Sequence, residues 1–196
     1  MKEIEFWFSI GSTYTYLSVS RLKEVERKFE LSFSWQPFSV KKIMREMDNV
    51  PFPPTKQAKV DYMWRDIQRR AHGYGFEARV PAPYPLKEFD LADRITVLGM
   101  QVGWCSNYVQ ATYRRWFLEW LELGSEPNVS ERIREIGQDS ERILELATSG
   151  ENCEIYSSQT ESAQSKGIFG RPSFIVDGEL FWGDDRLEDA VSWAFR

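Results

Sequence analysis

The chain has 196 residues, of which 42% are hydrophobic, and its formal net charge is −5. This length suits one compact domain, or one domain that carries a sizeable insertion. Lys and Arg are dispersed among Asp and Glu without a basic stripe, so nucleic acid is not an expected partner. No apolar run approaches the roughly 20 residues of a membrane span, and residues 1–10 lack the apolar core of a secretory signal. We therefore expect a cytoplasmic protein.

The first 36 residues alternate between strand and helix patterns. Residues 4–10 place Ile4, Phe6, Phe8 and Ile10 on one side at period two, which predicts a buried strand. Residues 13–29 carry apolar residues at near-helical spacing, and residues 31–36 alternate again. The connection of roughly 20 residues is long enough to make the two strands parallel.

The middle of the chain is predicted to be helical, without strand patterns. Proline-rich loops at 49–55 and 80–85 flank a helix that runs from about Val60 to Tyr74. Further helical stripes cover 92–102 and a segment that starts near Val109, includes Trp120 and ends near Gly124. Shorter amphipathic pieces follow at 131–136 and 140–148. We expect most of the tryptophans here to be core residues, and some to line a pocket.

The C-terminal part returns to strand patterns. The stretch SFIVDGELFWG, residues 173–183, predicts a hairpin around the turn dipeptide Asp177-Gly178. A last helix is predicted over 186–195. The order is therefore β-α-β, a helical insertion, then β-β-α, which indicates one sheet built from both ends of the chain, with the insertion beside it.

Two hydroxyls stand at the predicted start of the first long helix, in the stretch SIGSTYTYLS, residues 9–18. Ser12 and Thr13 are residue types that cap helices by accepting a free backbone N–H. A helix entrance also combines a positive dipole with spare N–H groups, which suits an anion. The residues alone leave capping and ligand binding open.

Other reactive residues indicate no familiar site. Cys105 and Cys153 form no CxxC motif, so neither a dithiol redox site nor a cysteine-rich zinc site is predicted. The one histidine, His72, lies in a helical pattern, and no G-x-S-x-G elbow accompanies it. We expect no metal site and no serine-histidine-aspartate triad.

Three stretches make the chain resemble a known family. FSIGSTYTYL, residues 8–17, resembles the motif F-D-F-x-S-P-Y-x-Y-L of 2-hydroxychromene-2-carboxylate isomerases and kappa-class glutathione transferases. GIFGRPSFIVDGELFWGDDRLEDA, residues 167–190, is similar to their C-terminal signature. DNVPFPP and the helix pattern after it are similar to their insertion loop and first insertion helix. The resemblance implies an α/β thioredoxin-like fold of the DsbA type, with 1–40 and 160–196 forming the thioredoxin-like domain and 41–159 a helical insertion domain.

The resemblance also implies a set of site residues. Ser12 falls on the catalytic serine, whose hydroxyl hydrogen-bonds the sulfur of bound glutathione. Pro172 falls on the cis-proline of the fold, where the backbone of Arg171 would pair with glutathione like an added strand. Three further residues complete the glutathione site: Asp184 and Asp185 for the γ-glutamyl end, and Asn49 in the loop that closes over glutathione.

Two departures from the motif concern the helix entrance. Thr13 replaces the proline that usually follows the serine, and it could compete with Ser12 for the sulfur. Ser9 replaces the usual aspartate. Both changes can reshape the turn without removing the hydroxyl that faces the sulfur.

The function implied by the resemblance is a glutathione-dependent isomerase, in which a thiolate adds to a conjugated double bond, the bond rotates and elimination follows. A kappa-like glutathione transferase shares every motif above, and a non-catalytic glutathione-binding protein would keep the fold. A disulfide oxidoreductase needs cysteines at the helix entrance, which this chain lacks. The resemblance further implies a small aromatic or conjugated substrate and a homodimer.

Overall fold

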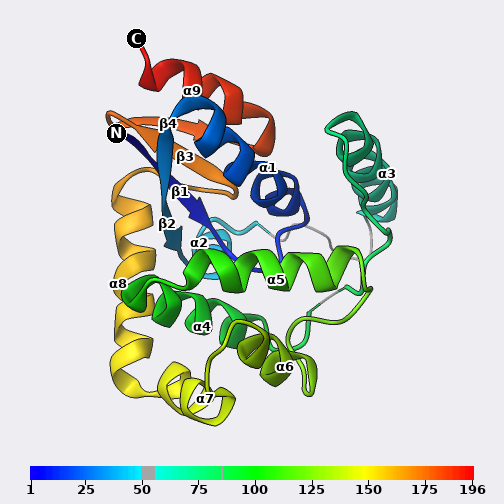
Figure 1. The fold of residues 1–196 in the computed structure, drawn as a ribbon, viewed down its shortest axis with the longest axis vertical. Coiled ribbons are helices and arrows are strands. Elements are labelled where there is room, and N and C mark those ends of the chain that lie inside the picture. Colours follow the sequence, from blue (N-terminus) through cyan, green and yellow to red (C-terminus); the bar gives the residue numbers. More distant parts are fainter. Residues whose placement is uncertain (50–55, 85) are drawn as a thin grey trace.

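The strands of the described residues form one mixed sheet that is assembled from both ends of the chain, as the sequence predicts. The computed structural model describes residues 1–49, 56–84 and 86–196. Its strands are β1 (Lys2–Phe8), β2 (Leu31–Pro37), β3 (Ser173–Val176) and β4 (Glu179–Trp182), in the spatial order β2-β1-β3-β4. Strand β1 is parallel to β2 and antiparallel to β3, and β3 pairs with β4 in an antiparallel hairpin (Figure 1).

Alternation along β1 directs side chains to both faces of the sheet. Ile4, Phe6 and Phe8 are fully buried in the core that includes apolar residues of α1 (Thr13–Phe29) and α9 (Leu187–Ala194). Trp7 belongs to a second cluster with residues of α2 (Val40–Glu46) and α8 (Gly150–Ser165) on the other face. Ile10 lies beyond the end of β1, in the turn that leads to α1.

The hairpin turn has the backbone conformation that its dipeptide predicts. Asp177 and Gly178 have φ angles of 50° and 83°, and positive φ at both central residues is the mark of the turns that suit tight hairpins. The hairpin leads through the short 3-10 helix η2 (Asp184–Arg186) into α9.

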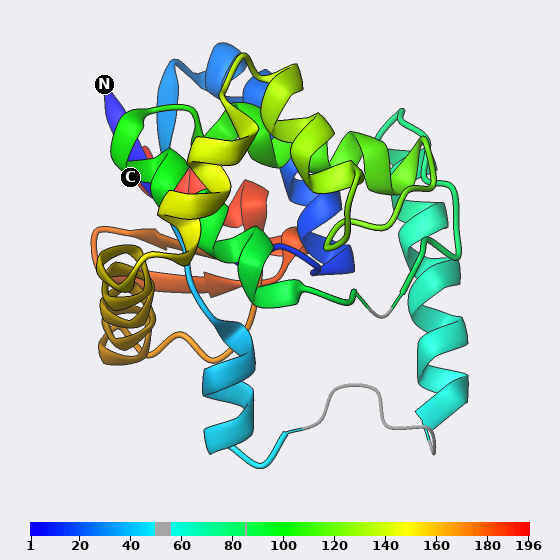
Figure 2. The same ribbon diagram turned by 90° about the horizontal axis from the view of Figure 1, so that it is seen from below.

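The predicted insertion, residues 41–159, includes α3 (Gln57–Gly73), α4 (Phe89–Val102), α5 (Cys105–Phe117), α6 (Asn128–Glu135) and α7 (Ser140–Thr148). Figure 2 shows α3 at the edge of the molecule, and α3 packs beside α1. Trp116 and Phe117 of α5 are fully buried in the main core, as the tryptophan stripe predicts. The proline-rich loop predicted at 49–55 lies, apart from Asn49, outside the described residues.

The end of one helix differs from the prediction. The helix that starts near Val109 was expected to include Trp120, but α5 ends at Phe117 and Trp120 has a φ of 61°. That prediction is wrong because the Trp120 indole turns away to donate to the carbonyl of Pro81, which the helical stripe could not reveal. The domain boundary predicted between 159 and 160 falls inside α8, and the division into two domains stays a prediction.

Candidate functional site

The entrance of α1 is formed by a turn that presents Ser12. Gly11 has a φ of 88°, a conformation that glycine adopts without steric cost, and Ser12 follows as the N-cap. The Ser12 hydroxyl accepts the backbone N–H of Thr15 at 3.3 Å, so Ser12 caps the helix as its residue type predicts. Among the described residues, no hydrogen bond of this side chain uses its O–H donor. The hydroxyl can therefore cap the helix and still donate to a ligand atom.

The neighbouring hydroxyl is occupied differently. Thr13 donates to the thioether sulfur of Met63, on α3, at 3.2 Å. The carbonyl of Ser12 accepts the hydroxyl of Tyr113, on α5, at 3.1 Å. Contacts from two insertion helices thus hold the helix entrance, and Ser12 rather than Thr13 keeps an O–H donor available.

The second predicted element, Arg171–Pro172, precedes β3 and has a cis peptide bond. The carbonyl of Pro172 accepts the N–H of Gly183 at 2.9 Å, which ties the start of β3 to the end of β4. The Arg171 side chain is largely buried, and this burial lowers the pKa of its guanidinium.

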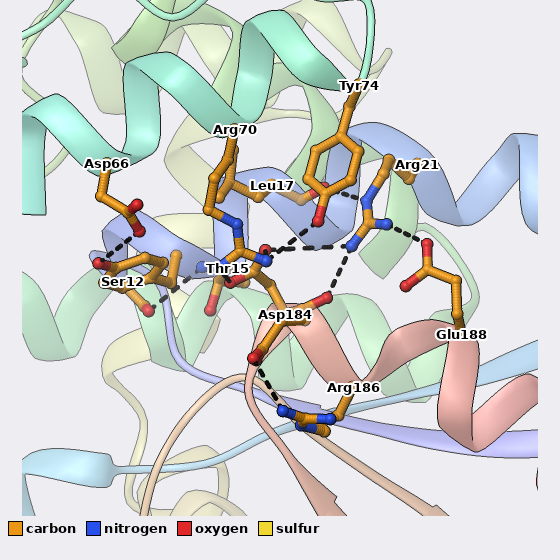
Figure 3. Close-up of polar contacts among 12 residues, drawn as sticks. Ser12, Thr15, Leu17, Arg21, Asp66, Arg70, Tyr74, Asp184, Arg186 and Glu188 are labelled. Atoms are coloured by element: carbon orange, nitrogen blue, oxygen red, sulfur yellow. Dashed lines mark hydrogen bonds and ion pairs between the residues drawn. The ribbon is translucent and has the colours of Figure 1, made fainter.

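Asp184 is 1% exposed and is the centre of a polar network that Figure 3 shows. Its Oδ1 accepts Nη1 of Arg70 at 2.9 Å, and its Oδ2 lies 2.7 Å from Nη2 of the same residue. Arg21, on α1, donates to the Asp184 carbonyl at 2.7 Å and pairs with Glu188. Burial raises the pKa of Asp184 to about 7, although the charges of Arg70 and Arg21 oppose the rise.

Asp185 differs from its neighbour in exposure. Its side chain is 51% exposed, and one oxygen lies 3.3 Å from Arg186. The carboxylate of Asp184 is already engaged by Arg70, whereas Asp185 presents its carboxylate to solvent. Of the two predicted γ-glutamyl contacts, Asp185 is the one whose geometry leaves an acceptor free for an ammonium group.

A cavity of about 480 Å³ brings four of the predicted residues together. It is bounded by α1, α3 and the two segments around Pro172 and Asp184. Its lining consists of Tyr14, Tyr62, Asp66, Arg70, Arg171, Pro172, Trp182, Gly183, Asp184, Asp185 and Arg186. The volume lies in the range of small-molecule sites. A larger groove of about 650 Å³, between α1 and α5, is lined by none of the predicted site residues.

The structure places Asn49 apart from these residues. It is exposed just beyond α2, where its backbone N–H donates to the Met44 carbonyl at 2.8 Å. It does not line the cavity of about 480 Å³ as the described residues define it. Its role over a ligand stays a prediction, because the rest of its loop, 50–55, lies outside the described residues.

Sequence reasoning missed three charged residues that shape this region. Arg21 and Arg70 lie in helical patterns among other charged residues, and Asp93 lies in another. Of these three, Arg70 lines the cavity. Asp66, one helical turn earlier on α3, lines it too and accepts the Tyr14 hydroxyl at 3.1 Å. Tyr14 belongs to the recognised motif, and this is the one signal that could have led to Asp66.

The remaining reactive residues stand apart from the cavity. Cys105 is buried, which raises the pKa of its thiol, and Cys153 is half-buried. In the described parts of the chain, no cluster of three potential metal ligands is found. The described helices also include none that is long and apolar enough to cross a membrane.

A comparison with family models decides the family. Residues 3–192 match the model of the DsbA-like thioredoxin domain. The chain belongs to the DsbA-like thioredoxin domain family. This confirms the predicted fold class, a thioredoxin-like fold with a helical insertion.

Within this family, the chain is similar to 2-hydroxychromene-2-carboxylate isomerases, which confirms the resemblance seen in its motifs. It is 27% identical to the isomerase of Pseudomonas putida over 188 residues, covering 94% of this chain and 90% of that protein. It is 24% identical to the isomerase of Sphingobium xenophagum over 198 residues, covering 98% of this chain and 97% of that protein. The solved structure of a 2-hydroxychromene-2-carboxylate isomerase has a TM-score of 0.87 at 23% identity, covering 99% of this chain and 95% of that one.

More distant DsbA-like structures share the fold at lower similarity. The cytosolic disulfide reductase DsbM from Pseudomonas aeruginosa has a TM-score of 0.64 at 12% identity, covering 98% of this chain and 95% of that chain. A disulfide reductase of this fold needs cysteine chemistry, and residues 12–15 of this chain, Ser-Thr-Tyr-Thr, contain no cysteine. The helix entrance here therefore offers hydroxyls instead.

Proposed function

We propose that the protein is a glutathione-dependent isomerase of the 2-hydroxychromene-2-carboxylate isomerase type. The observation that carries the proposal is the cavity of about 480 Å³, which gathers Arg171, Pro172, Asp184 and Asp185 beside the start of α1. The similarity to curated isomerases, which extends over 94% and 98% of the chain in two cases, supports the choice of reaction.

The residues at the site fit glutathione by their chemistry. A tripeptide with an ammonium group and two carboxylates needs acceptors and cations in one cavity, and this lining offers Asp185 together with Arg70 and Arg186. A backbone that precedes a cis-proline at a strand start can pair with an extended peptide. A structure of DsbM in complex with GSH, which shares the fold at a TM-score of 0.64, agrees with this use of the fold.

In this proposal, glutathione supplies the thiolate that adds to a conjugated double bond of the substrate and leaves after the bond has rotated. The protein's own part is to keep that sulfur ionised and in place. Ser12 does so with an O–H donor, since a hydrogen bond to the charged form lowers a thiol pKa. The positive end of the α1 helix dipole acts in the same direction.

The experiment that tests this function follows the interconversion of 2-hydroxychromene-2-carboxylate and its isomer by absorbance, with and without glutathione. We expect a rate that saturates with glutathione and falls at least tenfold in Ser12→Ala, roughly the effect of losing one stabilising donor. A matched control is Ser20→Ala, on α1 but away from the entrance. Isomerisation at the same rate without glutathione would contradict the proposal.

A further inference from the structure

The turn that presents Ser12 is held by a buried carboxylate from another part of the chain. Asp93, on α4, is fully buried, and its Oδ2 accepts the hydroxyl of Ser9 at 2.7 Å. Its Oδ1 accepts the backbone N–H of Ile10 at 2.6 Å. From α8, Tyr156 donates its hydroxyl to Oδ2 at 3.2 Å. Three donors therefore converge on one carboxylate, which is the pattern that an ionised acid requires.

These contacts lead directly to Ser12. The carbonyl of Ser9 accepts the backbone N–H of Ser12 at 3.4 Å, and Gly11 is the only residue between Ile10 and Ser12. Fixing both Ser9 and Ile10 therefore fixes the direction from which the chain enters α1. A shift of about 1 Å at such a position is enough to weaken a contact with a reacting atom considerably.

Asp93 also interacts with the other half of the site. The positive charge of Arg171, which lines the cavity, lowers the pKa of Asp93, and the charge of Asp93 raises that of Arg171. Four parts of the chain therefore surround Asp93: the turn after β1, Tyr156 of α8, Tyr113 of α5 and Arg171 before β3. Burial is the largest influence and raises the pKa of Asp93 to about 7.

We propose that Asp93 is a positioning residue for Ser12: its ionised carboxylate anchors Ser9 and Ile10 and so sets the orientation of the Ser12 hydroxyl at the start of α1. This inference rests on the proposed function for the identity of the ligand, but the anchoring itself can be tested without one. Nothing in the chain pattern indicated it, because a single aspartate in a helix usually faces solvent.

The first test records the backbone amide shifts of Ile10 and Ser12 by NMR between pH 5 and 9, on the protein without ligand. We expect both amides to titrate together with one midpoint near 7 in the wild type. Both titrations should vanish in Asp93→Asn. The control is Asp90→Asn, which removes an exposed carboxylate from the same helix and should leave both titrations in place. A Ser12 amide that does not follow Ile10 would overturn the proposal.

The second test measures the thiol pKa of bound glutathione by thiolate absorbance, which a purely structural residue would not move. We expect Asp93→Asn to raise this pKa by about one unit, a tenfold loss of thiolate stabilisation, while Asp90→Asn leaves it unchanged. Ser9→Ala, which removes one of the three donors, should give a smaller change in the same direction. If the wild type binds no glutathione, the proposed function fails, and the NMR titration still decides the role of Asp93.

Discussion

The carboxylate of Asp184 and the guanidinium of Arg70 lie side by side, with Nη1 2.9 Å from Oδ1 and Nη2 2.7 Å from Oδ2. This pair joins α3 of the insertion to η2, which follows the hairpin. Arg21 adds a third member from α1, since it donates to the Asp184 carbonyl at 2.7 Å. Two residues of the cavity wall, Asp184 and Arg70, therefore belong to a charge network contributed by three separated segments of the chain.

Breaking this network from its buried side should cost stability. Asp184→Ala leaves Arg21 and Arg70 without their shared carboxylate, and we expect the free energy of unfolding to fall by about 2–4 kcal/mol. Arg70→Ala should cost less, because Asp184 keeps Arg21. Urea unfolding of both single variants and the double variant gives the coupling, which we expect to exceed about 1 kcal/mol.

Asp185→Asn is the matched control for this measurement. Its carboxylate is 51% exposed, and surface substitutions of this kind usually change stability by less than about 0.5 kcal/mol. Strictly additive effects of the Asp184 and Arg70 substitutions would show that the two side chains are independent and that the network is not cooperative.

Gly183 should be needed both for its own backbone conformation and for the position of Asp185 at the cavity. Gly183 has a φ of 115°, and a Cβ at this position would lie 2.4 Å from Oδ1 of Asp185. We expect Gly183→Ala to lower stability by about 1–3 kcal/mol and to weaken glutathione binding, since Asp185 has to move. Thermal unfolding and calorimetry measure the two effects.

Gly178→Ala distinguishes the strain of a positive φ from the displacement of Asp185. Gly178 has a φ of 83° in the hairpin turn, but a Cβ there meets no neighbouring atom. This variant should lose stability through its backbone alone and bind glutathione as the wild type does. Equal losses of binding in both variants would indicate a general effect on the hairpin rather than a contact with Asp185.

Stability should decrease as pH rises from about 4 to about 7. Asp93 and Asp184 both have folded-state pKa values raised to about 7, well above the value of about 3.9 in an unfolded chain. In this window the folded protein holds protons that the unfolded chain releases, so their stabilisation is complete below pH 4 and lost by pH 7. Each buried acid contributes a slope of at most about 1.4 kcal/mol per pH unit.

Asp93→Asn is expected to flatten part of this dependence, because it removes one of the two titrating groups. Denaturant unfolding at pH 4.5, 5.5, 6.5 and 7.5 measures the slope, and Asp90→Asn serves as the exposed control on the same helix. A wild-type stability that stays constant or rises across this window would contradict the raised pKa values of the two carboxylates.

The sequence was most informative where local patterns determine the structure. The helix predicted over 13–29 is observed as Thr13–Phe29, since Ser12 caps it and the apolar stripe is regular. Helix α8 was not predicted as a separate element, because its buried positions include Asn152 and Thr160, and a polar buried face gives no apolar stripe. Helix α2 was not predicted, because its 7 residues are too few to show a clear helical pattern.

The residues of the candidate site also differ in whether a local pattern could predict them. Ser12, Pro172 and Asp185 could be predicted as site residues because they lie inside motifs that can be read from neighbouring residues. Arg70 and Asp93 were not found, because Arg70 meets Asp184 across 114 positions and Asp93 meets Ser9 across 84. Such pairs exist only once the chain has folded, and charged residues in amphipathic helices usually face solvent.

The two cysteines should differ in reactivity. Cys105 is buried and its thiol pKa is raised, whereas Cys153 is half-buried and accepts a hydrogen bond from Arg94 at 3.4 Å. We expect an aromatic disulfide reagent to titrate one thiol in the native protein and two after denaturation. Cys153→Ser should remove the native reaction, and a fast reaction that survives this substitution would place Cys105 nearer the surface than the structure does.

The central claim is that the Ser12 hydroxyl stabilises a glutathione thiolate at the entrance of α1. The measurement that tests it most directly is calorimetry of glutathione binding between pH 6 and 9, in buffers of different ionisation enthalpy, for wild type, Ser12→Ala and Thr13→Val. We expect the wild type and Thr13→Val to release a proton on binding, because the Thr13 hydroxyl is engaged with Met63, and Ser12→Ala to lose this release. Binding without proton release in the wild type, or proton release that persists in Ser12→Ala and disappears in Thr13→Val, would contradict it.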